Sequence, residues 1–418
     1  MDSERNFAHI ERTLHSHDGQ DLQHFMTNSP WSVRPVYRQI QAEIAMTPTL
    51  TTGGVLILDE TADEKAGTHN AGASRQYNGR LGKVDVCRVD TVLAYCHPAA
   101  RVWTLVDAEL FLPEEWFGPD WAEKRRDLGV PAERVFQTKP ELGWEMIERA
   151  RANGLPFEQV CCDGVYGRKQ ELRAALEARQ IGYAAEVPSN TQVYRKPPRR
   201  PDRAESGPGP SRKHWEVREL GRHRSTRWER RRVRCAERGW LEVEGAVLRV
   251  WTEYQQRVRP EWLVIRREAN GKCRYTLLNG PEEATAQSLV ERSGWRYYVE
   301  RLIEDGKSGL GWDEFRAQKY RATEHHLALT ALATWFVAQT KLEWGEQHPR
   351  DAQLATELEL PVLPALSTAN VREMLKAVLP LPDLTKERAR ELVVEHLVKR
   401  SLSMRSRLRK QRAKGSSP

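Results

Sequence analysis

Two short apolar runs that each end at an aspartate constrain this chain more than any other feature. Residues 55–58, VLIL, precede Asp59, and residues 160–162, VCC, precede Asp163 and a glycine. Runs of this kind predict buried β-strands. A single Asp-Gly pair is often only a turn, because Asp bonds its own backbone and Gly accepts positive φ. The repetition favours a second interpretation, in which the two strands carry a pair of carboxylates that meet in space.

Length and charge favour a protein of two or three domains with a polyanionic partner. The chain has 418 residues, 30% of them charged and 39% hydrophobic, and a formal net charge of +8. A core of ordinary size is therefore expected under a strongly ionic surface. The basic balance favours nucleic acid as partner ahead of an acidic membrane.

Cysteine spacing and the first residues indicate a soluble intracellular protein. None of the six cysteines forms a CxxC pair or lies at zinc-finger spacing to histidines, so we expect buried thiols. The first residues are charged and lack the apolar core of a signal peptide. The longest apolar stretch, residues 327–337, is too short to span a bilayer, and we expect no membrane association.

Hydrophobic periodicity predicts an α/β layer. Residues 1–50 have a helical pattern, with a helix start at Ser29-Pro30. From residue 55 onward strand patterns alternate with helical ones, which is typical of an α/β fold. Besides the two runs before the aspartates, the predicted elements are strands 84–95, 102–111 and 182–187 and helices 140–153 and 169–180.

Residues 192–285 predict a basic, β-rich insertion into this layer. Residues 196–213 are rich in Pro, Gly and Arg, and we expect them to be disordered. Five tryptophans then recur every eleven to thirteen residues, a spacing that suits short strands joined by turns. The alternative is a disordered linker followed by a solvated sheet. Helices are expected again after Trp295 and over residues 324–342, and the basic residues 399–418 are expected to order only on a polyanion.

A third carboxylate lies on the helix predicted from Trp295. At about 100° per residue, Arg296, Glu300 and Lys307 share a face beside an apolar stripe, so Glu300 can lean over the strand ends. The alternative is a surface helix with ordinary i,i+4 ion pairs. Glu304 is the rival for the third carboxylate.

The chain resembles the DDE transposases of bacterial insertion sequences, and within them the branch that carries a β-strand insertion between the second Asp and the Glu. The signature of that family around the Glu is Tyr, two residues, Arg, three residues, Glu, six residues, Lys. This chain has Ser293, Arg296, Glu300 and Lys307, so three of the four positions match. The resemblance covers roughly residues 20–345 and includes SPW at 29–31, SRQYNGRLGKVD at 74–85, LFLPEEWF at 110–117 and TKPELGWEM at 138–146.

The resemblance implies a ribonuclease H-like mixed sheet flanked by helices, in the α/β class. It divides the chain into five parts. These are an N-terminal helical segment (1–50), a first part of the catalytic core (51–191), the basic β-rich insertion (192–285), a second part of the core with the Glu-bearing helix (286–345), and a C-terminal helical segment with a basic tail (346–418).

The resemblance also implies a function and its residues. Asp59, Asp163 and Glu300 would be catalytic and would hold two Mg²⁺ ions, with Mn²⁺ able to substitute. Carboxylate oxygens suit Mg²⁺, and two such ions can serve both oxygens of a phosphoryl transfer. Without metal the three carboxylates would repel one another, so at least one pKa should be raised. The implied partner is double-stranded DNA, bound by a homodimer on paired ends in the bacterial cytoplasm. The cations expected on phosphates are Arg296, Lys307, Arg316, Lys319 and Arg321.

Two other functions stay open at this point. One is a ribonuclease H-like nuclease that cuts without joining, and the other is a DNA-binding descendant of a transposase that has lost catalysis. Ser293 in place of Tyr favours keeping the second. So does the length of the segment before SPW. The chain starts about 28 residues before Ser29, whereas the family generally carries a longer helical region there, which can include an element that binds the transposon end.

Overall fold

The computed structural model describes residues 19–198, 214–236, 239–316, 318–347, 366–378 and 394. Disorder was predicted for residues 196–213, of which 199–213 lie outside these ranges, as does the basic tail, 399–418. So do the first 18 residues of the predicted N-terminal helical segment.

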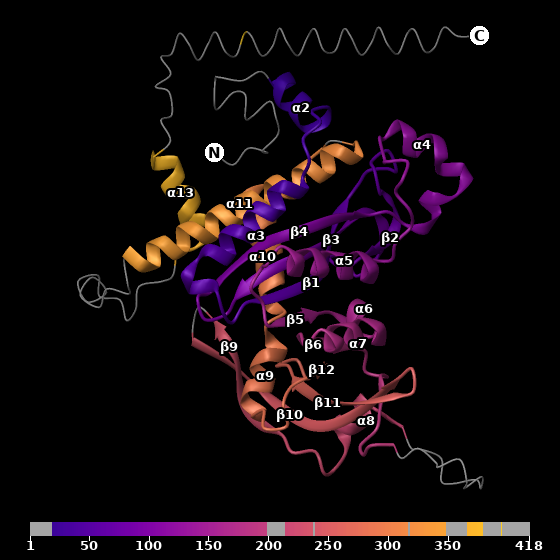
Figure 1. Ribbon diagram of the computed structural model, residues 1–418, viewed down its shortest axis with the longest axis vertical. Coiled ribbons are helices and arrows are strands. Elements are labelled where there is room, and N and C mark those ends of the chain that lie inside the picture. Colours follow the sequence, from indigo (N-terminus) through magenta and orange to yellow (C-terminus); the bar gives the residue numbers. More distant parts are fainter. Residues whose placement is uncertain are drawn as a thin grey trace.

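The core is a mixed sheet with β1 (Val55–Glu64) near its centre (Figure 1). β3 (Lys83–His97) runs antiparallel to β1 on one side, and β4 (Val102–Phe111) runs antiparallel to β3. On the other side β5 (Gln159–Cys162) is parallel to β1, and β6 (Gly182–Val187) is parallel to β5. This mixed sheet, with its flanking helices, is the ribonuclease H-like α/β fold that the sequence predicts.

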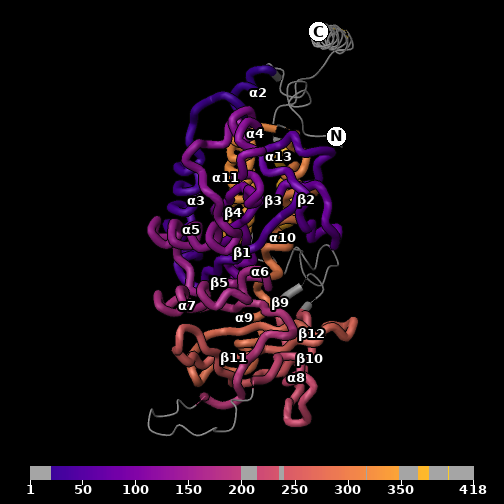
Figure 2. The backbone as a smooth tube through the Cα atoms, turned by 90° about the vertical axis from the view of Figure 1, so that its right-hand side faces the viewer, coloured from indigo at the N-terminus to yellow at the C-terminus, as the bar shows by residue number. Residues whose placement is uncertain are grey.

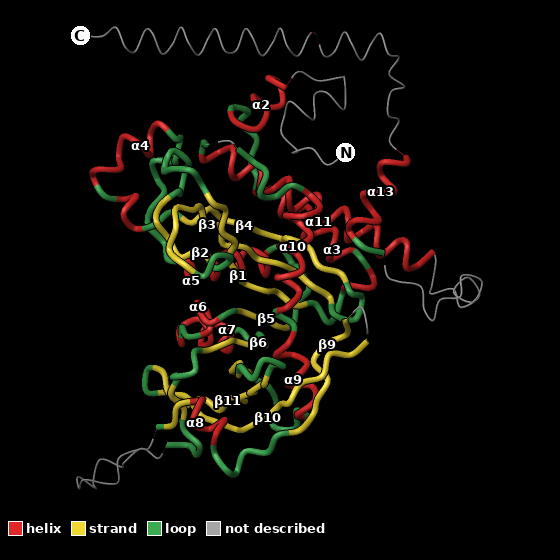
Figure 3. Tube along the Cα trace, turned by 180° about the vertical axis from the view of Figure 1, so that it is seen from behind, coloured by secondary structure: helices red, strands yellow, loops and turns green. Residues whose placement is uncertain are grey.

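Helices cover both faces of the sheet (Figure 3). α5 (Lys139–Ala152) packs on the face to which Leu58 points, since a side chain at Gly143 would meet the Leu58 methyl groups. α10 (Tyr297–Leu310) lies against the opposite face, where its first turn reaches Asp59. α11 (Tyr320–Gln347) runs along β4 and is joined to α3 (Arg34–Met46) by a 2.6 Å hydrogen bond from the Trp335 indole to Glu43.

The remaining elements are short or peripheral. They are α2 (Gly19–Thr27), η1 (Pro48–Leu50), β2 (Ser74–Asn78), η2 (Glu114–Phe117), η3 (Pro119–Trp121), α4 (Ala122–Asp127), α6 (Gly164–Gly167), α7 (Gln170–Ala178), α9 (Ala286–Gly294) and α13 (Thr368–Val378). None of the helices in the described ranges has the length and apolar composition needed to cross a membrane.

The β-rich insertion is continuous with the core sheet. It contains β7 (Gln192–Val193), β8 (Trp215–Glu216), α8 (Val217–Arg222), β9 (Glu229–Ala236), β10 (Gly239–Tyr254), β11 (Arg257–Arg267) and β12 (Cys273–Leu278). β12 pairs antiparallel with β6, and β11, β10 and β9 follow in order, so core and insertion share one ten-stranded sheet. Figure 2 shows these strands at the end of the molecule opposite α2 and α4.

Three details differ from the sequence prediction. β1 does not end at Asp59 but continues to Glu64, because β3 pairs with it as far as Glu64 opposite Cys87. No helix starts at Ser29-Pro30; α3 begins at Arg34, with Pro35 in its first turn. The helix expected from Trp295 starts at Tyr297, after the separate helix α9, which was not predicted.

Candidate active site

The register of β1 and β5 brings Asp59 and Asp163 together. Leu58 lies opposite Cys162 in the parallel pairing, and the two aspartates are the next residue on each strand. Adjacent strands are about 4.8 Å apart, so the two carboxylates start from neighbouring backbone positions. The two apolar runs suggested this pair, and the family resemblance implied that the two carboxylates act together.

Asp163 is held by the turn that follows its strand. Its Oδ1 accepts hydrogen bonds from the backbone N–H groups of Val165 (2.9 Å) and Tyr166 (3.4 Å), so it caps the short helix α6. The Tyr166 hydroxyl in turn donates to the Asp59 carbonyl oxygen at 3.3 Å. One carboxylate oxygen of Asp163 is thereby used for positioning.

Arg296 connects Glu300 to this pair. Its guanidinium lies 2.5 Å from Oδ2 of Asp59 and 2.6 Å from Oε1 of Glu300. The Asp59 side chain is 12% exposed and that of Glu300 is 50% exposed, so one end of the bridge is buried and the other reaches solvent. The structure therefore brings Asp59, Asp163 and Glu300 to one place, with an arginine between two of them.

The pKa values of the two aspartates are raised although Arg296 lies beside them. Burial raises the pKa of Asp59 to about 7; Arg296 opposes this shift and the Asp163 carboxylate adds to it. Burial likewise raises the pKa of Asp163, again against Arg296. Burial alone would lower the pKa of Arg296, but the surrounding acidic groups, Asp59 first, outweigh it and raise that pKa. A pair of carboxylates with raised pKa values is a common feature of functional sites.

Glu186 is a residue of this site that the sequence analysis missed. Its carboxylate lies 3.5 Å from Nε of Arg296, 3.5 Å from Arg266 and 3.4 Å from Arg274. A Cβ at Gly167 would lie 2.0 Å from the Glu186 carbonyl oxygen, so only glycine lets α6 pack so closely on β6. An acidic residue inside the otherwise apolar strand YAAEV was the available signal.

Two acidic side chains near the site point elsewhere. Glu60 faces the opposite side of the sheet, as strand alternation predicts, and pairs with Lys139 of α5 at 2.5 Å. Glu304 pairs with Arg301 and its side chain is 64% exposed, so it does not compete with Glu300 in this structure.

The predicted phosphate-binding cations are spread over the molecule. Lys307 donates to the Ala62 carbonyl oxygen of β1 at 2.9 Å, and burial lowers its pKa. Lys319 and Arg321 lie at the start of α11, where Arg321 donates to the Asn28 carbonyl oxygen at 3.0 Å. Arg316 is exposed in the segment between α10 and α11. Only Arg296 contacts Asp59 and Glu300 through bonds seen in the described ranges.

Ser293 does not belong to the site. It is buried in α9, and its hydroxyl donates to the Val290 carbonyl oxygen at 2.7 Å. Because α9 ends at Gly294 and α10 begins at Tyr297, the helical face that carries Glu300 does not extend back to residue 293.

The cysteines and the adjacent histidines have structural surroundings. Cys161 and Cys162 fill β5, where burial raises the pKa of each thiol above its ordinary value. His325 contacts the carbonyl oxygens of Met26 and Trp31, whereas His326 contacts that of Trp312. The two rings diverge, as their adjacency on a helix predicts.

The oxygen donors of the site suit a divalent cation, but their positions in this structure do not form a metal site. Within the described ranges, no three His, Cys, Asp or Glu side chains are placed to hold a metal ion. The guanidinium of Arg296 lies between Asp59 and Glu300. Carboxylate oxygens are the donors that Mg²⁺ prefers, and Arg296 already has a further acidic partner in Glu186.

Comparison with known proteins identifies the family of this chain. Residues 1–244, more than half of the chain, match the family model described as DDE superfamily endonuclease. The matched range includes Asp59 and Asp163 and ends before Glu300. The chain is also 25% identical over 304 residues to a probable transposase for insertion sequence element IS701 from Microchaete diplosiphon, which covers 72% of this chain and 69% of that protein.

Proposed function

The chain belongs to the DDE superfamily endonucleases, and from this membership we propose that it is a DNA transposase. It would cut at the ends of an insertion sequence and join the freed 3′-OH ends to target DNA. The similarity to an insertion-sequence transposase supports this activity over simple cleavage. Membership of this family implies the use of a divalent metal.

The observation that carries the proposal is the juxtaposition of Asp59, Asp163 and Glu300. Carboxylates from within β1, from just after β5 and from α10 lie together around Arg296, although they are separated by more than one hundred residues in sequence. Burial raises the pKa of Asp59 and of Asp163 even with Arg296 nearby, so a further cation would stabilise their charged forms. We assign these three residues as catalytic and metal-binding.

The three carboxylates would hold two Mg²⁺ ions, for which Mn²⁺ could substitute. When bound, such ions activate the attacking oxygen, neutralise charge on the phosphate and stabilise the leaving oxygen. Asp163 is positioned for this by its helix cap, and Asp59 by the pairing of β1 on both sides. Arg296 would exchange its carboxylate partners for a phosphate of the DNA backbone, which is the kind of ligand that arginine binds with two parallel hydrogen bonds.

Two phosphoryl transfers would follow in order. In the first, a water oxygen attacks the phosphorus at the end of the element, the 3′ oxygen leaves, and a 3′-OH and a 5′-phosphate result. In the second, that 3′-OH attacks a phosphodiester of the target and displaces its 3′ oxygen. Neither step requires a covalent enzyme intermediate. We further propose that a homodimer acts on paired ends, in the bacterial cytoplasm where genomic DNA lies.

The test uses a labelled DNA fragment that carries the terminal repeat flanking the gene. We expect cleavage at the repeat boundary and joining to a target plasmid with Mg²⁺ or Mn²⁺, and binding alone with Ca²⁺. Asp59→Asn, Asp163→Asn and Glu300→Gln should each lower the cleavage rate by roughly 10³-fold or more, because several kcal/mol of charge stabilisation are lost. Glu304→Gln is the matched control and should cleave like the unaltered protein.

Each alternative function has its own outcome in this assay. Cleavage without joining would indicate a nuclease, and tight binding without cleavage in any metal would indicate a DNA-binding descendant. Full activity of Asp59→Asn would contradict the assignment of the catalytic residues.

A further inference from the structure

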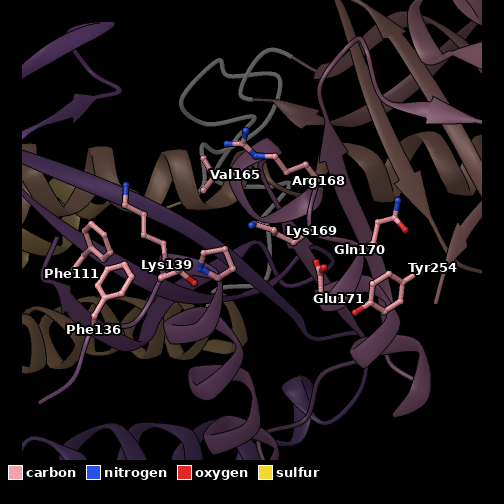
Figure 4. Close-up of a pocket in the computed structure, with 11 residues that line it drawn as sticks. Phe111, Phe136, Lys139, Val165, Arg168, Lys169, Gln170, Glu171 and Tyr254 are labelled. Atoms are coloured by element: carbon pink, nitrogen blue, oxygen red, sulfur yellow. The ribbon is translucent and has the colours of Figure 1, made fainter. Parts of the chain in front are cut away.

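A hollow of about 720 Å³ lies between the core and the insertion (Figure 4). Its volume falls within the range of sites that hold one small molecule. The residues that line it are Phe111, Phe136, Thr138, Lys139, Pro140, Val165, Arg168, Lys169, Gln170, Glu171 and Tyr254.

The walls combine aromatic rings with positive charge. Phe111 and Phe136 lie on one side of the hollow and Tyr254 on the other, with Lys169 between them (Figure 4). Arg168 and Lys169 make no ion pair within the described part of the chain, and Glu171 is the only carboxylate in the lining. Aromatic faces together with cations are what proteins use to bind single-stranded nucleic acid.

The first turn of α7 adds backbone donors to the same wall. α7 has nine residues, and its N-cap, Lys169, makes no side-chain bond to the first turn. By contrast, Thr138 and Glu141 satisfy the start of α5 in a capping box. The amides of the first turn of α7 thus remain available to an anion such as phosphate.

The hollow adjoins the carboxylates. Val165, in its lining, donates its backbone N–H to Asp163 at 2.9 Å. Lys139, also in the lining, pairs with Glu60, whose side chain leaves β1 on the face opposite to that of the Asp59 carboxylate. The hollow therefore meets the site at Asp163, across the first turn of α6.

The insertion supplies Tyr254 from a strained hairpin. Tyr254 pairs with Arg257, and the two residues of the turn, Gln255 and Gln256, have φ values of 47° and 61°. Such turns favour Asn-Gly, because residues other than Gly, Asn and Asp are disfavoured at positive φ. Strain of this kind concentrates at functional positions.

We propose that this hollow binds one nucleotide of a single DNA strand beside the cut. The base would stack on Tyr254 or on the two phenylalanines, and its phosphate would lie at the start of α7 near Lys169. The inference rests on the proposed function, since it names how the substrate of that same site is held.

The test measures binding of a fluorescently labelled thymidine decanucleotide to the full chain by anisotropy, at several salt concentrations. Tyr254→Ala should weaken binding about 5-fold to 100-fold, as expected for the loss of one stacked base. Lys169→Ala should lower the slope of log affinity against log salt by about 0.7, the value for one phosphate contact on a single strand. Glu171→Gln should tighten binding about twofold, a gain that unfolding cannot produce.

Two exposed residues elsewhere serve as matched controls. Tyr77→Ala, on β2, and Lys272→Ala, between β11 and β12, should leave affinity and salt slope unchanged. Equal behaviour of the Tyr254 and Lys169 variants and these controls would overturn the proposal.

Failure of this inference is distinguishable from failure of the proposed function. If the protein cleaves DNA but the Tyr254 and Lys169 variants bind the oligonucleotide with unchanged affinity, only the proposed nucleotide site is wrong. If those variants lose oligonucleotide binding but the unaltered protein does not cleave DNA, the proposed transposase activity is wrong and the nucleotide site stands.

Discussion

Arg296 is bound by acidic groups on three elements, and only two of its partners are candidate metal ligands. Asp59 lies on β1, Glu300 on α10 and Glu186 on β6. Motif spacing predicted both Arg296 and Lys307 as phosphate ligands, but the structure distinguishes them. Lys307 is tied to the β1 backbone, whereas Arg296 holds carboxylates. Spacing along a helix predicts which face a residue occupies, but the partner depends on what packs against that face.

Replacement of Arg296 by Gln should tighten divalent-metal binding in the absence of DNA. A fixed cation about 4 Å away opposes a second one by on the order of 4 kcal/mol at an effective dielectric of 20. We expect the Kd for Mn²⁺, measured by electron paramagnetic resonance, to fall at least roughly tenfold. DNA cleavage by the same variant should decrease, because its phosphate ligand is lost.

Arg301→Gln is the control for that experiment. Arg301 lies on the same helix but pairs with Glu304 and Asp305, so its removal should leave metal binding unchanged. Weaker or unchanged metal binding in Arg296→Gln would show that Arg296 helps to assemble the metal site instead of competing with the ion.

At the scale of elements, the apolar pattern predicted the presence of strands well, but it predicted their end residues less well. The strands predicted over residues 84–95, 102–111 and 182–187 are present as β3, β4 and β6. β1 extends through the polar residues after Asp59 because its partner β3 is 15 residues long and supplies hydrogen bonds to that end. The separate helix α9 was missed for a similar reason: its buried side depends on contact with β9, which local sequence does not show.

The start of α11 makes the stability of the protein depend on pH. His326 stacks on Phe315 at 4.3 Å between ring centroids, and its Nε2–H donates to the Trp312 carbonyl oxygen at 2.8 Å. Burial lowers the pKa of His326 to about 4. The unfolded state binds a proton near the ordinary value of 6.5, so stability is retained above that pH and lost as the pH falls toward 4.

Unfolding in urea at pH 7 and pH 5 measures this effect. The free energy of unfolding should fall by up to about 2 kcal/mol through His326 between these two values. His326→Gln keeps a donor for Trp312 but does not titrate, so its decrease should be smaller by that amount. Identical decreases in both proteins would show that His326 is not the responsible group.

At the scale of the whole molecule, a buried ion pair joins the core to the insertion. Nε of Arg173, on α7, lies 3.1 Å from Oε1 of Glu261, on β11, and neither side chain is more than 2% exposed. The Tyr183 hydroxyl donates to the same oxygen at 2.7 Å, and the Thr252 hydroxyl donates to the other. Composition predicted a basic insertion, but no local pattern identified Glu261 as the partner of an arginine 88 residues away.

Arg173→Met should destabilise the protein by about 3–5 kcal/mol, because it leaves the Glu261 carboxylate buried without its charge partner. Chemical denaturation followed by tryptophan fluorescence would measure the change. Arg222→Met, at an exposed position on α8, should alter stability by less than about 0.5 kcal/mol. A similar small effect of both variants would mean that the Tyr183 and Thr252 hydroxyls suffice to hold Glu261.

The pairing of β12 with β6 also has a consequence for aggregation. Without the insertion, β6 would be the last strand of the core sheet, with a row of unpaired backbone groups open to other chains. The insertion moves that edge outward to β9, whose sequence ERRRVRCA places several like charges along it. Charged edge strands resist association with one another. The arginines that suggest a nucleic-acid partner thus also protect the sheet, and a chain trimmed to its catalytic elements would lose that protection and self-associate through β6.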